Sequence, residues 1–319
     1  MPNEIIRTGI IGCGAISLHH IKTMFQNDQT EISALCEPSK RAIRKARKVF
    51  KDVGLKAPPN EPNLTKFLEN FDLDVVLIAT PHSMHHDQTI ASLEGGLDVL
   101  LEKPMAMNTE EAIRMIETRD QTGKTLVIAF QGSLCPLVRL ASDHIKNKVF
   151  GELLSVSATV WQNWGSNTSG TWRQKTALSG GGFTFDTGAH MLNTVADLVN
   201  QDFVEVAAWM DNKGRPVETL SVAMAKLKSG AFVTFHACGE TSRSCSSEIK
   251  VFCDNAIFTT GVWGGYLQIQ KGREKEAQEM PLPPQSSVWN TFLKVCANEI
   301  DNPSPPEIGL RMIRLYDAI

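Results

Sequence analysis

The chain has 319 residues, which at about 150 residues per domain predicts two domains. Its formal charge is −3, and this near balance argues against a nucleic-acid or membrane-surface protein. The N-terminus lacks the basic segment of a signal peptide, and no apolar run approaches the roughly 18 residues of a membrane span. The 7 cysteines include no CxxC pair and are typical of reduced thiols, so we expect a cytoplasmic protein.

The first part of the chain alternates short apolar strands with amphipathic helices. Continuous Val/Ile/Leu runs predict strands at residues 5–11, 32–36, 75–79, 99–101 and 126–130. Helical spacing of apolar residues predicts helices near residues 18–25, 42–50, 85–93 and 109–121. The helix at 42–50 has a basic opposite face, which we interpret as a solvated surface rather than a nucleic-acid patch. The alternation implies right-handed crossovers and an α/β fold with a doubly wound parallel sheet.

After about residue 150 the pattern changes to longer strands. They are predicted at residues 153–160, 204–210, 219–227, 231–237 and 248–252. This part is expected to form an α+β domain with an open, largely antiparallel sheet and helices on one face. Loops at 281–284 and 302–306 each lead into a helix, and the last helix, 309–319, stops in mid-pattern, so a shortened chain is expected. All 6 tryptophans lie in the second half of the chain.

A glycine-rich turn follows the first strand and opens the first helix. Gly12 permits a tight bend, Gly14 lets the backbone approach a pyrophosphate, and the helix N-terminus supplies unpaired N–H groups. Ser17 replaces the third glycine of the usual fingerprint and is small enough for close packing. Because Glu37 ends the second strand, the pattern predicts a dinucleotide site; a glycine turn without a ligand is the alternative. The predicted cofactor contacts in this turn are Gly12, Gly14, Ala15 and Ile16.

Glu37 favours NAD over NADP, because its carboxylate accepts hydrogen bonds from the ribose hydroxyls and repels a 2′-phosphate. Ser39, Lys40 and Arg41 follow directly and would bind that phosphate if Glu37 swung away, so NADP stays open as the alternative. We therefore expect residues 1–130 to form an NAD(P)-binding Rossmann domain and residues 131–319 to form the second domain.

Two further segments end strands of the parallel sheet, at the carboxyl edge where such sheets bind ligands. Thr80 and Pro81 follow the third strand, Glu102 and Lys103 follow the fourth, and Pro104 ends that strand. The residues at this edge that are predicted to contact the cofactor are Thr80, Pro81, Glu102 and Lys103. A lysine at this edge serves as a charged clamp or, with a lowered pKa, as a proton shuttle; a surface lysine is the alternative.

Two groups of residues raise the question of a metal site. His82, His85 and His86 have no carboxylate or cysteine at a suitable spacing, so we interpret them as crevice wall or helix surface, with His85 as a cofactor contact. Three further residues are near-evenly spaced but lack short ligand knuckles: Cys238, Cys245 and Cys253. We expect no metal.

The second part of the chain carries a glycine run that is followed by Asp186 and His190. These two are four positions apart, and they share one face if the helix has begun by Asp186. A carboxylate that orients an imidazole makes histidine an effective general base near neutral pH. The alternative is a helix-capping aspartate and a buried histidine.

The chain resembles the Gfo/Idh/MocA family of oxidoreductases in four segments that span essentially its whole length: GIIGCGAIS, ATPHSMHH, LLEKPMAMNTEEA and TWRQKTALSGGGFTFDTGAH. The EKP tripeptide and the glycine run with its aspartate and histidine are the specific parts. The resemblance implies a Rossmann domain paired with a domain whose open sheet forms substrate-site walls and the oligomer interface. It also implies that Lys103, Asp186 and His190 are the catalytic lysine, aspartate and histidine.

Three positions depart from the pattern of that family. Ser133 stands where many members have an arginine, His82 replaces a commoner asparagine, and Asn193 replaces a frequent aspartate. The last two are expected to border the substrate or cofactor pocket.

The resemblance implies hydride transfer between NAD(P) and a secondary alcohol of a sugar, sugar derivative or cyclitol. His190 would take the proton of the substrate hydroxyl, and Asp186 would orient His190. Lys103 would bind the substrate through a hydrogen bond to the same hydroxyl oxygen. Trp172 and Arg173 are predicted to line the substrate pocket, because an indole offers a flat apolar face and a guanidinium binds carboxylate, phosphate or hydroxyl groups. A core tryptophan and a surface arginine are the alternative.

Two other functions remain as alternatives. Some relatives are NAD-dependent glycosidases, and others are non-catalytic dinucleotide-sensing regulators, although the retained lysine, aspartate and histidine argue against a regulator. The expected partners are a small sugar or polyol and further copies of the chain, in a homodimer or homotetramer. Neither nucleic acid nor membrane is expected as a partner.

Overall fold

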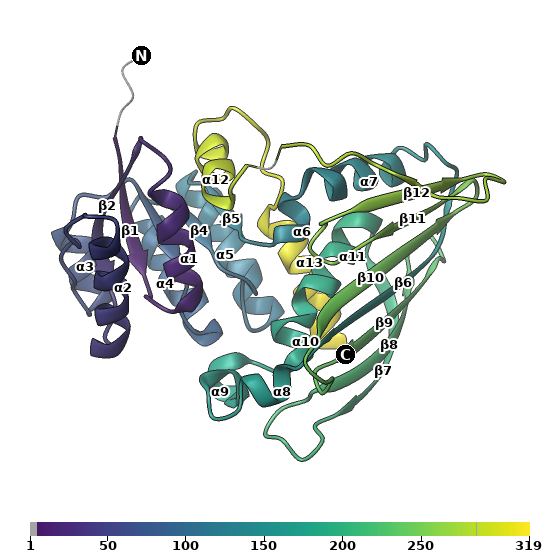
Figure 1. Cartoon of the computed structure of the whole chain (residues 1–319), viewed down its shortest axis with the longest axis horizontal. Helices are drawn as coiled ribbons and strands as arrows, with labels where there is room; N and C mark the ends of the chain where they lie inside the picture. The colour runs from purple at the N-terminus through teal and green to yellow at the C-terminus, as the bar shows by residue number, and fades with distance from the viewer. Residues whose placement is uncertain (1–4, 285) are drawn as a thin grey trace. The chain divides into compact units, whose positions relative to one another are not determined.

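The computed structural model describes residues 5–284 and 286–319, which fall into two compact units. The first contains residues 5–105, 110–129 and 286–306, and the second contains residues 106–109, 130–284 and 307–319. Each unit is built on its own sheet (Figure 1). Among the described residues, none of the helices combines the length and the apolar character that a membrane crossing requires.

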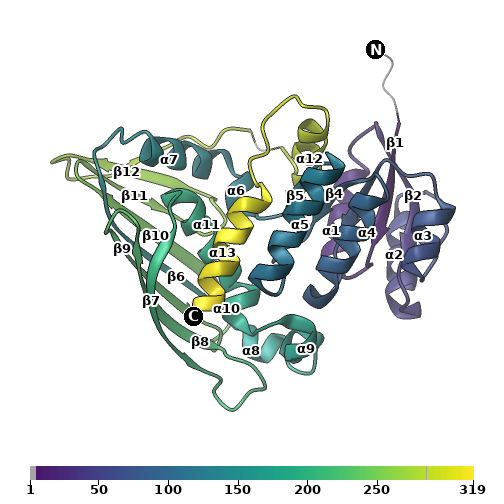
Figure 2. The ribbon, with the colours of Figure 1, turned by 180° about the vertical axis from the view of Figure 1, so that it is seen from behind.

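The first unit has a five-stranded, all-parallel sheet in the order β2-β1-β3-β4-β5. Helices cover both of its faces, with α1 and α2 in front in Figure 1 and α4 and α5 in front in Figure 2. All positions of β3 are therefore buried, which explains its continuous apolar sequence. The predicted doubly wound sheet is confirmed. Its strands are β1 (Ile6–Ile11), β2 (Thr30–Cys36), β3 (Val75–Ile78), β4 (Asp98–Leu101) and β5 (Leu126–Ile128).

Amphipathic spacing determines which face each helix of this unit buries. Helix α2 buries Ile43, Ala46 and Phe50 and exposes its basic side chains, as expected for a solvated face. The helices are α1 (Ala15–Met24), α2 (Lys40–Asp52), α3 (Leu64–Asn70), the 3-10 turn η1 (His82–Met84), α4 (His85–Glu94), α5 (Thr109–Thr122) and α12 (Val288–Cys296).

Helix α12 returns to the first unit from late in the chain. Its Trp289 is fully buried and donates its indole N–H to Thr30 Oγ1 at 2.8 Å. Asn290 accepts a hydrogen bond from the Asn27 amide, also at 2.8 Å. These contacts with the start of β2 explain why residues 286–306 belong to this unit, a return that a single boundary at residue 130 does not describe.

The second unit has an eight-stranded sheet in the order β13-β12-β11-β10-β6-β9-β8-β7. Strand β6 pairs in parallel with β9, and every other pair is antiparallel, so the expected open and largely antiparallel sheet is confirmed. Its strands are β6 (Leu153–Gln162), β7 (Phe203–Asp211), β8 (Leu220–Leu227), β9 (Phe232–Cys238), β10 (Cys245–Cys253), β11 (Ala256–Thr260), β12 (Leu267–Lys271) and β13 (Gln278–Glu279).

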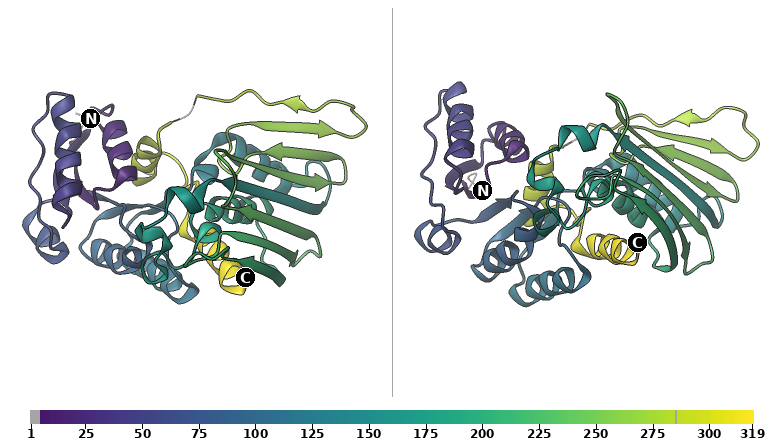
Figure 3. Two further views of the ribbon diagram at one scale, coloured as in Figure 1. Left: turned by 60° about the horizontal axis from the view of Figure 1, so that its bottom comes forward. Right: turned by 90° about the horizontal axis from the view of Figure 1, so that it is seen from below.

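Helices cover only one face of this sheet (Figure 3). Helix α11 is buried at all of its positions beneath the strands, while alternate residues of β8 and β9 remain exposed on the opposite face. The helices are α6 (Gln131–Leu134), α7 (Pro136–Lys146), α8 (Trp164–Asn167), the 3-10 turn η2 (Trp172–Gln174), α9 (Thr176–Ser179), α10 (Phe183–Asp186), α11 (Gly188–Val199) and α13 (Pro306–Ala318).

Candidate active site

The predicted glycine turn joins β1 to α1 and leaves the start of that helix open. Gly12 has a φ of +87°, and a Cβ there would lie 2.7 Å from the Ala79 carbonyl oxygen, so this position requires glycine. Gly14 caps α1 without any side-chain hydrogen bond, and a Cβ there would meet nothing within 4 Å. Ser17, in place of the third glycine, donates its buried hydroxyl to the Gly12 carbonyl at 2.6 Å.

This turn suits a diphosphate. The first turn of α1 contains no acidic residue, and Gly14, Ala15 and Ile16 are exposed. The amide groups at the start of a helix carry a partial positive charge and bind phosphate oxygens. The residues present therefore fit the dinucleotide that the sequence predicted.

Glu37 directly follows β2 and reaches back to the glycine turn. Its Oε2 accepts the Cys13 amide at 2.8 Å, and its Oε1 accepts the Ser39 amide at 2.7 Å. Burial, together with the nearby Glu37 carboxylate, raises the pKa of Cys13 to about 12, so this thiol stays protonated. Asn60 brackets the Glu37 backbone with two hydrogen bonds, of 3.1 and 3.2 Å. Asn60 is a second contributor to this corner that the sequence did not reveal.

His85 ties together the two loops that follow β3 and β4. Its ring is completely buried, with Nδ1 at 2.7 Å from the Pro104 carbonyl and Nε2 at 3.1 Å from the Thr80 carbonyl. Burial lowers the pKa of His85 and so favours the neutral ring, which has a single N–H for the shorter contact with Pro104. The predicted residues Thr80 and His85 are thus brought together, and His85 also binds the backbone of Pro104.

Lys103 follows β4, and the bond to Pro104 is cis. The preceding Glu102 is buried and meets His20 of α1, with 2.7 Å between Glu102 Oε1 and His20 Nε2. Its other oxygen accepts the Lys103 amide at 3.3 Å. Glu102 therefore fixes the backbone at Lys103 from the interior of the first unit, and its predicted contact with the cofactor stays a prediction.

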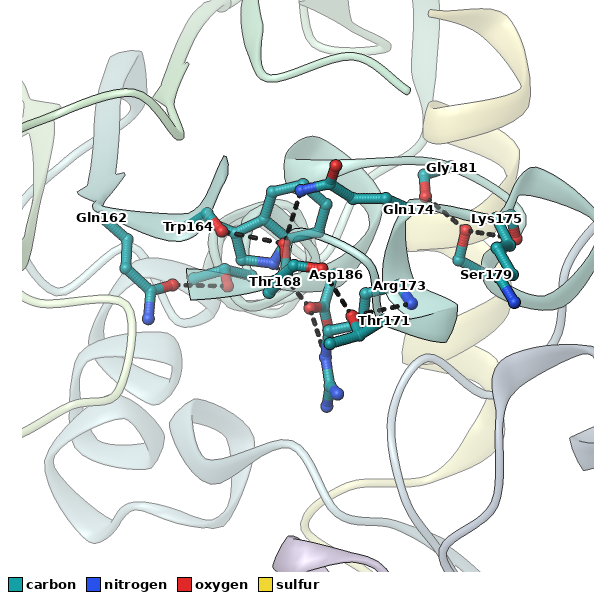
Figure 4. A network of polar contacts seen from close by, with 11 residues as sticks. Gln162, Trp164, Thr168, Thr171, Arg173, Gln174, Lys175, Ser179, Gly181 and Asp186 are labelled. Atoms are coloured by element: carbon teal, nitrogen blue, oxygen red, sulfur yellow. Dashed lines mark hydrogen bonds and ion pairs between the residues drawn. The ribbon is translucent and has the colours of Figure 1, made fainter. Parts of the chain in front are cut away.

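In the second unit, Asp186 ends α10 and is almost completely buried. Its Oδ2 accepts the Trp164 indole N–H at 2.8 Å and the Arg173 Nε–H at 2.9 Å (Figure 4). The Arg173 guanidinium also lies over the Trp172 ring, at 4.5 Å from the ring centroid. Trp172, Arg173 and Asp186 are therefore brought together, and Trp164 is a member that the sequence did not reveal.

His190 lies one turn further along, on α11. Thr187 keeps helical backbone angles, so Asp186 and His190, four positions apart, lie on the same side of a continuing helical path. The His190 ring meets the edge of Phe130 and lies against Trp263, with both centroid distances at 5.9 Å. The two aromatic rings fix the orientation of the imidazole, which suits a general base.

The glycine run brings the backbone of α10 against Glu218. A Cβ on Gly182 would lie 1.9 Å from the Glu218 carbonyl oxygen, and the Gly182 amide donates to Glu218 Oε2 at 2.6 Å. The Phe183 amide donates to the Glu218 carbonyl at 2.9 Å. Burial raises the pKa of Glu218. This residue, which the sequence did not reveal, anchors the start of the helix that carries Asp186.

Two of the three positions that depart from the family pattern, Ser133 and Asn193, are hydrogen-bonded to one another. The Asn193 amide donates to the Ser133 hydroxyl at 2.9 Å, and both residues are fully buried. Two neutral groups are thus hydrogen-bonded to one another where the resemblance implied an arginine and an aspartate. The third unusual residue, His82, is buried in the first unit.

No group of three or more His, Cys, Asp or Glu side chains suited to a metal ion occurs among residues 5–284 and 286–319. Each of the cysteines considered as zinc ligands is a free thiol: Cys238, Cys245 and Cys253.

Two family models match the chain. One, described as "Oxidoreductase family, NAD-binding Rossmann fold", matches residues 6–130, and the other, "GFO/IDH/MocA C-terminal domain", matches residues 138–259. Together they cover well over half of the chain and both of its sheets.

Among similar proteins, D-glucoside 3-dehydrogenase of Escherichia coli is 29% identical over 195 residues, which are 60% of this chain and 54% of that protein. Alpha-N-acetylgalactosaminidase of Shewanella oneidensis is 26% identical over 209 residues, which are 62% of this chain and 45% of that protein. The chain thus spans about half the length of the curated relatives that it matches.

A solved structure shares the fold of the whole chain. The WlbA dehydrogenase from Bordetella pertussis, determined in complex with NADH and UDP-GlcNAcA, superposes with a TM-score of 0.83 at 22% identity, over 99% of this chain and 95% of that one. With the open glycine turn in one unit, the glycine run in the other and a family model matching each, the chain belongs to the GFO/IDH/MocA family of oxidoreductases, and its first unit is that family's NAD-binding Rossmann domain.

Proposed function

We propose that this protein transfers a hydride between NAD and a secondary alcohol of a sugar, sugar derivative or cyclitol. The observation that carries the proposal is the start of α1, where no side chain caps the helix and Glu37 binds the preceding turn. The family model that matches this unit is described as NAD-binding. The relative named D-glucoside 3-dehydrogenase supports a sugar hydroxyl as the reacting group.

Three side chains divide the work at the reacting hydroxyl. His190 takes the hydroxyl proton as the general base, and Asp186 stabilises the positive charge that His190 then carries. Lys103 hydrogen-bonds the same oxygen and favours its developing negative charge. The nicotinamide ring, when bound, accepts the hydride. Trp172 provides an apolar wall for the sugar, while Arg173 already serves Asp186 and is at most a shared contact.

Glu37 makes NAD the preferred cofactor. Its carboxylate is fixed at the glycine turn by two backbone amides, so swinging away to admit a 2′-phosphate would cost both hydrogen bonds. NADP remains the second choice, through the exposed Ser39, Lys40 and Arg41.

A second copy of the chain is proposed to cover the bare face of the eight-stranded sheet. Trp209, Val222, Met224 and Phe232 are each about half exposed or more on β7, β8 and β9, and Trp209 is paired directly with Val222. Exposed apolar side chains on adjacent strands indicate an interface. Light scattering that reports a monomer at micromolar concentration contradicts this part of the proposal.

A glycosidase is the second candidate function, because one curated relative is named an alpha-N-acetylgalactosaminidase. The two functions differ in their products. A screen of sugars, sugar acids, inositols and nitrophenyl glycosides with NAD should give reduced nicotinamide in step with a ketone product. Release of nitrophenol without net reduction of NAD would establish the glycosidase instead.

A further inference from the structure

A solvent-open surface pocket lies in the second unit where β6 ends and β10 begins. It has a volume of about 400 Å³ and is lined by Gln162, Asn163, Asn167, Arg243, Ser244 and Cys245. The Asn163 amide donates to the Ser244 carbonyl at 3.1 Å, which joins the two sides of the pocket through the backbone.

The segments that line this pocket also contact Asp186 or the residue that follows it. Gln162 Oε1 accepts the hydroxyl of Thr187, the residue that follows Asp186, at 2.8 Å. Asn167 ends α8, the short helix whose Trp164 donates to Asp186. Figure 4 shows Gln162, Trp164 and Asp186 in one close view. A ligand in the pocket is therefore held by the elements that hold Asp186.

The side chains around the pocket can recognise hydroxyl groups. Thr187 occupies Gln162 Oε1, so the Gln162 amide is oriented with its NH₂ group free to donate. The carboxamides of Asn163 and Asn167 both donate and accept hydrogen bonds, as hydroxyl groups do. These polar groups can hydrogen-bond to the hydroxyl groups of a sugar, while the carbon atoms of the lining can pack against its ring.

Arg243 adds an uncompensated positive charge. Its side chain is exposed, and within the part of the chain that the structure describes it has no ion pair. The acidic residues nearest in sequence and framework are already paired, Glu240 with Arg215 and Asp186 with Arg173. A guanidinium binds carboxylate or phosphate oxygens in pairs, and it does so most strongly where the anion has no competing partner.

We propose that this pocket is a substrate subsite that binds a sugar carrying an acidic group. Arg243 holds the carboxylate or phosphate of the sugar, and Gln162, Asn163 and Asn167 bind its hydroxyl groups. The proposal rests on the proposed function and narrows its substrate class to acidic sugars. Because Arg173 is already paired with Asp186, Arg243 rather than Arg173 binds the anionic group of the sugar.

The test compares acidic and neutral sugars on three variants of the full chain with NAD present. The probes are glucuronate and galacturonate for a carboxylate, glucose 6-phosphate for a phosphate, and glucose and galactose as neutral counterparts. Binding is measured by calorimetry, and turnover by reduced nicotinamide. Wild type should bind at least one acidic probe about 10- to 100-fold more tightly than its neutral counterpart, since one charge-assisted hydrogen-bond pair contributes that much.

Arg243→Gln should abolish this preference, Arg243→Lys should restore part of it, and the exposed Arg273→Gln, as the matched control, should retain it. Equal binding of acidic and neutral probes by wild type, or an unchanged preference in Arg243→Gln, overturns the subsite. The binding measurements test the subsite even if no probe reduces NAD. Failure of every sugar to reduce NAD would contradict the proposed function but not the subsite.

Discussion

The indole N–H of Trp164 donates to Oδ2 of Asp186 at 2.8 Å, and both side chains are buried. Arg173 donates to the same oxygen at 2.9 Å. One carboxylate oxygen is thus fixed by two donors from a segment that precedes the glycine run. Trp164 acts as a positioning residue for Asp186 under the proposed function.

Trp164→Phe keeps the aromatic packing but removes this N–H. Because a hydrogen bond to a charged group contributes about 1.5–3 kcal/mol, we expect kcat to fall by about 10-fold or more with little change in the KM for NAD. Trp161→Phe, on the neighbouring strand, is the matched control. Steady-state kinetics of the two variants check this, and equal kcat values in both would contradict a positioning role.

Gly182→Ala tests the anchoring of α10 on Glu218. The added methyl group would overlap the Glu218 carbonyl oxygen, so the free energy of unfolding should fall by about 3 kcal/mol or more. Gly265→Ala, where a Cβ meets nothing within 4 Å, should change it little. Urea unfolding of both variants measures the difference. An unchanged free energy of unfolding in Gly182→Ala would show that the close contact between Gly182 and Glu218 is not required for stability.

The buried His85 predicts a pH dependence of stability. Its pKa in the folded chain is lowered by burial below the usual 6.5, so at pH values under 6.5 the unfolded chain takes up a proton that the folded chain does not. Its contribution to stability is therefore present above pH 6.5 and is lost as the pH falls, with a slope of at most about 1.4 kcal/mol per pH unit.

Urea unfolding between pH 7.5 and 5 checks this on His85→Gln. The variant should show a flatter decline than wild type, whereas His19→Gln, an exposed histidine on α1, should follow wild type. Parallel curves for His85→Gln and wild type would rule out His85 as the titrating group.

Glu37→Gln removes the negative charge near the predicted ribose site while retaining an oxygen for the turn. We expect the ratio of kcat/KM for NAD to that for NADP to fall by about 10-fold, because the repulsion of the 2′-phosphate is lost. Glu31→Gln, an exposed carboxylate on the same strand, is the control. A clear NADP preference in wild type would make the NAD assignment wrong.

Lys103→Ala and His190→Ala should each lower kcat by about 100-fold or more and leave NAD binding largely intact, since each acts on the reacting oxygen. Fluorescence titration with NADH checks the binding. Wild-type turnover in either variant would remove that residue from the mechanism.

The repeating patterns in the sequence predicted the parallel sheet and strands β6 to β10 of the second sheet. The apolar runs from residues 5 to 130 gave a parallel sheet, and the glycine turn lies where β1 meets α1 because such a turn has few other conformations. The spacing of Asp186 and His190 predicted that they share one side of a helix, whereas their catalytic roles were implied only by the family resemblance.

Long-range contacts were not predictable from these patterns. Strands β11 to β13 are short and lack a distinct run, and α3 has only Phe67 as a fully buried residue. Asn60, Trp164 and Glu218 are distant in sequence from the groups that they hold, and no local motif marks them. The return of Trp289 to the first unit depends on its contact with Thr30, which is formed only in the folded chain.

Transfer of an isotope label from the sugar to the cofactor is the most direct test of the proposed hydride transfer. A substrate found in the sugar screen is labelled with deuterium at the carbon of each candidate secondary alcohol in turn, and the cofactor is analysed by mass spectrometry. Hydride transfer should place one deuterium in the reduced nicotinamide for each keto sugar formed, from a single ring position. Sugar turnover that leaves the cofactor free of deuterium at every labelled position would contradict it.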